Sequence, residues 1–257
     1  MEMATLLKKA GAIQYVERQS GASAACLVFL HGAGGSHLKW KSQLEQLPLN
    51  YRLLAPDLPG HGGSGGTSLD SIKGYTDAIA AFLQALDIPE PVIIGGQSMG
   101  AAIALQLVLD HPEMFRGLFL VGAGARLRTA PAFLEALDRG EINASFLKMA
   151  FAPESDPDMV AAEIDSFASA DARVLFHDFT ACDRFDVREE VKTIQLPTLV
   201  ATGEKDQMAP PRLAQYLAEN ISGAELKLMP GAGHFPMMEI PAVFNQELCA
   251  FVDKAIG

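Results

Sequence analysis

The sequence is 257 residues long, with 49% hydrophobic and 20% charged residues, which suits one globular α/β domain with a modest insertion. Its 20 Lys and Arg against 31 Asp and Glu give a net charge of −11, which disfavours nucleic acids and anionic membranes as partners. No apolar stretch reaches the roughly 20 residues that cross a bilayer, and residues 1–9 lack the basic-then-apolar order of a signal peptide.

Short apolar strands alternate with helical patterns over most of the chain, beginning with a strand at residues 12–18. The later strands are expected at residues 26–30, 51–55, 92–94, 117–121, 198–202 and 225–229. The helices that alternate with them are expected at residues 36–47, 68–86, 101–111, 211–220 and 241–256. Such alternation implies right-handed crossovers and a mostly parallel central sheet with helices on both faces, an α/β fold.

The alternation stops between Gly122 and Leu196, where no buried strand is predicted. Short helical patterns rich in Phe and Met occur there instead, at residues 131–138, 142–151, 156–170 and 172–181. We therefore expect a helical cap at residues 123–187, inserted into a core domain made of residues 1–122 and 188–257. Most of the cap aromatic residues should hold its small helices together, while a few should face a cleft.

A serine lies at the most informative turn of the chain. Ser98 is the centre of residues 96–100 (GQSMG), directly after the apolar run 91–95 and before the helical pattern 101–110. A serine at a tight strand-to-helix turn is a nucleophile elbow. The turn strains the serine backbone and requires small neighbours two residues away, while the helix N-terminus favours developing negative charge.

Partners for a serine nucleophile occur later in the chain. A serine hydroxyl needs a base, and the base needs an orienting acid. His234 follows the predicted strand 225–229, and both Glu204 and Asp206 follow the strand 198–202. Each lies past the C-terminal end of its strand, where open α/β sheets hold their sites.

Five motifs together resemble the α/β-hydrolase family, in particular its serine esterases and lactonases with a small helical cap. They follow the family's order and spacing over nearly the whole chain: residues 31–35 (HGAGG), 57–64 (DLPGHGGS), 96–100 (GQSMG), 203–206 (GEKD) and 233–236 (GHFP).

This resemblance implies a catalytic triad of Ser98, His234 and Asp206. Asp206 is preferred to Glu204 because the family pattern is Gly-x-x-Asp with a proline shortly after, and Glu204 stays the minor alternative. The resemblance also implies an oxyanion hole made by the backbone N–H groups of Ala33 and Met99.

These residues predict a serine hydrolase that cleaves carboxylic esters of small to medium apolar substrates through an acyl-enzyme, without metal or organic cofactor. The ligand is then a small-molecule ester or lactone. The alternatives are a lactonase or a carbon–carbon bond hydrolase with the same triad, and, more distantly, a non-enzymatic ligand receptor. Carbon–carbon hydrolases usually bind a carboxylate with a cap arginine, a role left open to Arg126, Arg128, Arg139, Arg173 and Arg184.

The remaining polar and sulfur residues have simpler interpretations. His31 is expected to brace the loop of Ala33 by hydrogen bonds, His61 to shape a loop between Gly60 and Gly62, and Glu239 to cap the last helix. Three cysteines without metal spacing, an odd number in a chain without a signal, indicate reduced thiols and a cytoplasmic protein. They are Cys26, Cys182 and Cys249.

Overall fold

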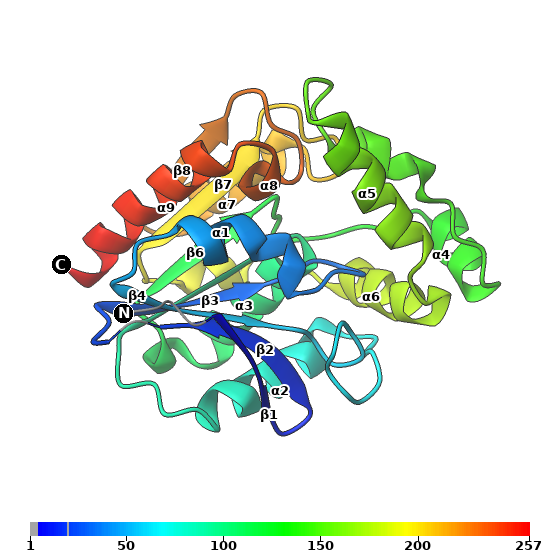
Figure 1. The fold of residues 1–257 in the computed structure, drawn as a ribbon. Coiled ribbons are helices and arrows are strands. Elements are labelled where there is room, and N and C mark those ends of the chain that lie inside the picture. The colour runs from blue at the N-terminus through cyan, green and yellow to red at the C-terminus, as the bar shows by residue number, and fades with distance from the viewer. Residues whose placement is uncertain (1–4, 20) are drawn as a thin grey trace.

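The computed structural model of the protein describes residues 5–19 and 21–257. Its centre is an eight-stranded sheet in the order β1-β2-β4-β3-β5-β6-β7-β8, antiparallel from β1 to β4 and parallel from there to β8 (Figure 1). The strands are β1 (Thr5–Ala10), β2 (Ile13–Arg18), β3 (Ala25–Leu30), β4 (Tyr51–Pro56), β5 (Val92–Gln97), β6 (Gly117–Val121), β7 (Thr198–Gly203) and β8 (Glu225–Met229). The mostly parallel sheet predicted from the alternation is confirmed.

Helices cover both faces of this sheet. Alternate residues of a strand point to opposite faces, so each face packs against its helices in a separate apolar core. In β3, Cys26, Val28 and Leu30 belong to the core under α2 and α3, whereas Leu27 and Phe29 belong to the core under α1 and α9 (Figure 1). The helices of this part are α1 (Lys41–Gln46), α2 (Ile72–Gln84), α3 (Met99–Asp110), α7 (Pro211–Asn220), α8 (Pro236–Glu239) and α9 (Pro241–Ile256).

Residues 122–197, here called the β6–β7 segment, contain no strand, as expected. Their one β-type pairing is an isolated antiparallel bridge between Arg126 and Asp186. Figure 1 shows α4, α5 and α6 grouped together at one end of the sheet, away from α1, α2 and α9. The elements of the segment are α4 (Pro131–Asp138), the 3-10 helix η3 (Ala144–Ala150), α5 (Pro157–Ala168), α6 (Ala172–Arg184) and the 3-10 helix η4 (Glu190–Thr193).

Two local expectations are corrected by the structure. The helix expected at 36–47 is a 3-10 turn (His37–Trp40) followed by the short α1, since the Ser36 hydroxyl accepts the N–H of Leu38 in a tight first turn. The helix expected from residue 68 begins only at Ile72, because extended Ser71 caps it by accepting the N–H of Gly74.

The opening hairpin was only half predicted. Strand β1 precedes the expected strand and pairs with β2 alone, so it is an exposed edge strand whose Lys8 and Lys9 obscure the apolar alternation. The sequence argument about a signal peptide used residues 1–9, of which residues 1–4 lie outside the described residues. No helix within residues 5–19 and 21–257 combines the length and apolarity needed to span a membrane.

Candidate active site

Ser98 has the backbone conformation that a nucleophile elbow requires. Its φ of 54° and ψ of −115° make it the one non-glycine residue with positive φ in the described parts of the chain. The strain is held by its neighbours: the Ser98 N–H donates to Val121 O at 2.9 Å, and its carbonyl accepts from Ala101 and Ala102 at 3.0 and 3.1 Å. A strained conformation persists only when the surrounding structure over-determines it, as it does here.

Glycines two residues on either side of Ser98 allow strand and helix to pass closely. A Cβ added to Gly96 would lie 2.5 Å from the carbonyl carbon of Gly100, and one added to Gly100 would lie 2.3 Å from Leu30 O. Both distances are below any real contact, so the expectation of small neighbours at this turn is confirmed.

Asp206 and His234 are hydrogen-bonded to each other. Asp206 Oδ2 accepts from His234 Nδ1 at 2.8 Å, while Asp206 Oδ1 accepts from the N–H groups of Met208 and Ala209 at 2.9 and 2.8 Å. Because Nδ1 carries the proton, Nε2 is the basic nitrogen of the ring. Glu204 is exposed, and its carboxylate makes no hydrogen bond or ion pair with any described residue.

The loop of His234 is held by Glu239, which is not the cap of the last helix that we expected. The Glu239 carboxylate accepts from the N–H groups of Gly233 and Phe235 at 3.0 Å, and from Ala152 N and Ser155 Oγ at 2.8 and 2.5 Å. It therefore joins the His234 loop to the β6–β7 segment. Partners more than 80 positions away leave no pattern in the local sequence.

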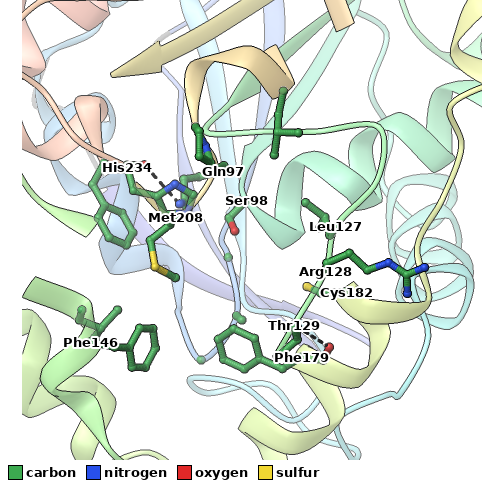
Figure 2. Close-up of a pocket in the computed structure, with 18 of the residues that line it drawn as sticks. Gln97, Ser98, Leu127, Arg128, Thr129, Phe146, Phe179, Cys182, Met208 and His234 are labelled. Atoms are coloured by element: carbon green, nitrogen blue, oxygen red, sulfur yellow. Dashed lines mark hydrogen bonds between the residues drawn. The ribbon is translucent and has the colours of Figure 1, made fainter. Parts of the chain in front are cut away.

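One cavity of about 670 Å³ is lined by both Ser98 and His234. Figure 2 shows these two residues with Met208 at one end of the pocket and Phe146 and Phe179 at the other. Much of the lining is apolar and comes from the β6–β7 segment together with the loops of residues 208 and 235: Phe146, Leu147, Phe151, Phe167, Phe179, Met208 and Phe235.

Four of the seven Phe residues in the β6–β7 segment line the cavity, more than the few that we expected to face it: Phe146, Phe151, Phe167 and Phe179. Phe133 packs edge-on against Phe146 and Phe179 with ring centroids 4.9 Å apart, yet it does not line the cavity. Phe146 also packs edge-on against Phe167 at 5.4 Å, and both of these rings face the cavity. The wall is therefore a continuous aromatic cluster of which only part meets a ligand.

The backbone N–H groups of Ala33 and Met99 are free to act as donors. Neither makes a hydrogen bond to any of residues 5–19 and 21–257, and Ala33 lines the cavity. His31 braces this loop as predicted, since its Nδ1 donates to Gly32 O at 2.8 Å and its Nε2 accepts from Leu58 N at 3.0 Å. Burial and the nearby His61 charge lower the pKa of His31 to about 3, so the ring stays neutral.

A half-buried ion pair, which the sequence did not reveal, joins the core domain to the β6–β7 segment at the cavity wall. Lys39 of the 3-10 turn before α1 forms an ion pair with Glu163 of α5, and both residues line the cavity. Burial lowers the pKa of Lys39 to about 8. Over the described ranges, no group of three or more His, Cys, Asp or Glu side chains is arranged to hold a metal ion.

Comparison with known proteins identifies the family. The profile of the Alpha/beta hydrolase family matches residues 27–247. The chain is 30% identical over 254 residues to a pimeloyl-[acyl-carrier protein] methyl ester esterase of Neisseria meningitidis serogroup C, covering 92% of this chain and 97% of the relative. It is 27% identical over 240 residues to a monoacylglycerol lipase of Mus musculus, covering 84% of this chain and 71% of the relative.

Solved structures agree with this assignment. A thermophilic esterase superposes with a TM-score of 0.81 at 28% identity, covering 99% of both chains. The enol-lactonase of Burkholderia xenovorans shares the fold, with a TM-score of 0.86 at 23% identity over 94% of this chain and 96% of the other. The chain therefore belongs to the α/β hydrolase family. It is an enzyme of the esterase type.

Proposed function

We propose that the protein is a serine hydrolase that cleaves carboxylic ester bonds of small to medium apolar substrates. The observation that carries the proposal is the Asp206–His234 hydrogen bond of 2.8 Å beside a cavity that also holds the strained Ser98. Ser98 is the nucleophile, His234 the base and Asp206 the orienting acid. The apolar lining favours uncharged acyl groups, and esterase relatives support ester bonds as the target.

In this mechanism Ser98 Oγ attacks the ester carbonyl carbon while His234 Nε2 takes its proton. The N–H groups of Ala33 and Met99 bind the oxygen that gains negative charge, at the N-terminus of α3. His234 then gives the proton to the departing alcohol, which leaves an acyl group on Ser98. Water attacks this acyl-enzyme with His234 as base, and the carboxylic acid is released as Ser98 regains its proton.

A second candidate, hydrolysis of a carbon–carbon bond in a substrate that bears a carboxylate, is favoured by one observation. Of the arginines open to that role, Arg126 and Arg128 line the cavity, and Arg126 Nε already lies 3.5 Å from Asp186 Oδ2 in an ion pair that a substrate carboxylate would have to share. Arg139, Arg173 and Arg184 do not line it.

The test is a substrate panel assayed with wild type and Ser98→Ala side by side. It contains short-chain aryl esters, lactones and carboxylate-bearing ring-cleavage products. Highest kcat/KM on the esters supports the proposal, whereas highest kcat/KM on ring-cleavage products supports the second candidate. Binding without turnover of any compound would indicate a ligand receptor and overturn both.

Hydrolysis is expected to continue at full rate after exhaustive chelation, because the proposed triad itself supplies nucleophile and base. The measurement is kcat on an aryl ester after dialysis against a strong chelator. A control sample receives the same dialysis followed by excess divalent cation. A loss of activity that the added cation restores would contradict the mechanism.

We also propose that residues 123–187 act as a cap over the core of residues 1–122 and 188–257 and limit acyl length. Overpacking a filled pocket costs about 1–3 kcal/mol, which is roughly one to two factors of ten in kcat/KM. Activity on p-nitrophenyl esters should therefore peak at short acyl chains and fall steeply at fatty-acyl lengths.

Phe146→Ala should shift this optimum toward longer chains, because the ring lines the cavity opposite Ser98 (Figure 2). Phe176→Ala is the matched control, since Phe176 belongs to the same segment but does not line the cavity. A wild-type optimum at long chains, or the same profile for Phe146→Ala and wild type, would contradict the proposal.

A further inference from the structure

Asp178 is a buried carboxylate that the mechanism above leaves unused. It lies in α6 of the β6–β7 segment (Figure 1) and is fully buried, with 0% of its surface exposed. A charged side chain is rarely buried unless it is paired and hydrogen-bonded. Its partners therefore indicate what the residue does.

The three donors to Asp178 all come from the core around the sheet. Asp178 Oδ2 accepts from Gly34 N and from His61 Nε2, both at 2.8 Å, and Oδ1 accepts from the Tyr75 hydroxyl at 2.6 Å. Gly34 follows Ala33 directly, so one of these bonds holds the loop that carries a proposed oxyanion donor.

Two anchors fix the backbone on either side of Ala33. On one side, Gly32 O accepts from His31 Nδ1 at 2.8 Å and from Gly35 N at 3.1 Å. This carbonyl and the Ala33 N–H share one planar trans peptide, in which O and H point in opposite directions. Holding the oxygen therefore orients the Ala33 N–H away from those partners. On the other side, Asp178 holds Gly34 N.

Leu175, one helical turn before Asp178, contacts the same glycine. A Cβ on Gly34 would lie 2.5 Å from Leu175 Cδ2, and Gly34 has a φ of +64°. Leu175 and Asp178 lie on one face of α6. The helix therefore restrains Gly34 by van der Waals packing and by a hydrogen bond at once.

His61 is the titratable partner of Asp178. Its Nδ1 lies 3.1 Å from Pro59 O and its Nε2 lies 2.8 Å from Asp178 Oδ2, so each ring nitrogen faces an acceptor. Burial opposes the charge, but the hydrogen bond and negative charge of Asp178 hold the pKa of His61 above its ordinary value. An asparagine has one uncharged oxygen for these three donors, so it loses at least one of them and holds Gly34 N more weakly than the carboxylate does.

We propose that Asp178 is a positioning residue for acyl transfer, which acts through Gly34 to hold the Ala33 N–H in the oxyanion hole. The β6–β7 segment then helps to position the oxyanion hole in addition to lining the cavity. This inference rests on the proposed function, because it concerns the same reaction at Ser98.

The test compares Asp178→Asn with Asp183→Asn. Asp183 is also in α6 and accepts Thr129 N at 3.0 Å within the β6–β7 segment, but it does not contact the Gly34 loop. Loss of one oxyanion donor costs about 100- to 1000-fold in kcat, so its displacement should cost roughly 10- to 100-fold. We expect that loss for Asp178→Asn with KM little changed, and an unchanged kcat for Asp183→Asn.

The affinity for a transition-state analogue distinguishes a role of Asp178 in positioning the oxyanion hole from a role in anchoring α6 alone. Affinity for a trifluoromethyl ketone should fall by about the same factor as kcat in Asp178→Asn, since the analogue needs the oxyanion hole. Unchanged kcat and inhibitor affinity in folded Asp178→Asn, or an equal loss of both in Asp183→Asn, would overturn the inference.

Leu175→Ala is the second variant if Asp178→Asn does not fold. It leaves the hydrogen bonds of Asp178 intact and removes the van der Waals contact of Leu175 with Gly34, so kcat and inhibitor affinity should again fall together. If both stay at the wild-type level, the inference is wrong. Ser98→Ala is assayed in parallel. An active Ser98→Ala enzyme would overturn the proposed function itself, whereas an inactive one leaves the Asp178 result as a test of the inference alone.

Discussion

Ser98→Ala is expected to lower kcat by on the order of a million-fold, the loss that follows removal of a triad nucleophile. The physical reason is that no other side chain in this mechanism can form the acyl-enzyme. Single-turnover and steady-state rates on an aryl ester measure the effect. Mass spectrometry after treatment with an organophosphate should place one covalent label on Ser98 of the wild type.

The backbone of Ser98 provides the fold control for this prediction. Alanine keeps a Cβ at a φ of 54°, so Ser98→Ala should retain the strain and the wild-type unfolding free energy. Ser98→Gly removes the Cβ and should be inactive yet more stable, because a positive φ costs a non-glycine residue about 1–3 kcal/mol. Residual activity near wild type in the alanine variant, or a label on another serine, would refute the assignment.

The parts of the fold that were predictable from sequence are those set by local patterns. Strands such as β3 and β5 are nearly continuous apolar runs because both of their faces are covered, and the glycines around Ser98 mark a turn that few other residues tolerate. Strand β1 was missed because an edge strand needs little apolar surface.

The sequence pointed to candidate site residues that follow strand ends, but it did not reveal contacts between residues far apart in the chain. Glu239 and Asp178 look like ordinary helix carboxylates in the sequence. Their carboxylates accept from backbone N–H groups that only the folded chain brings near them, that of Ala152 for Glu239 and that of Gly34 for Asp178. Hydrogen-bond partners 144 positions apart, as for Gly34 and Asp178, produce no periodicity.

The choice between Glu204 and Asp206 shows the same limit, since position alone left both open. They differ in the structure because the turn after β7 directs Asp206 inward. Its N–H donates to Gly203 O at 3.2 Å, and its side chain is anchored by the N–H groups of Met208 and Ala209. Asp206 is 3% exposed, whereas Glu204 faces solvent.

Asp206→Asn is expected to lower kcat by about ten-thousand-fold, because it reverses the tautomer of His234. The amide oxygen would stay on the two N–H groups of Met208 and Ala209, which leaves the NH₂ group facing His234 Nδ1. An NH₂ group donates, so Nδ1 must accept and the ring proton moves to Nε2. The nitrogen that should take the Ser98 proton is then already protonated.

Glu204→Gln is the matched control, two positions away and solvent-exposed, and its kcat should stay within about twofold of wild type, as for surface substitutions in general. Both variants are assayed for kcat on the same aryl ester across pH, with circular dichroism to check the fold. Loss of activity in Glu204→Gln together with a near-normal Asp206→Asn enzyme would transfer the orienting role to Glu204.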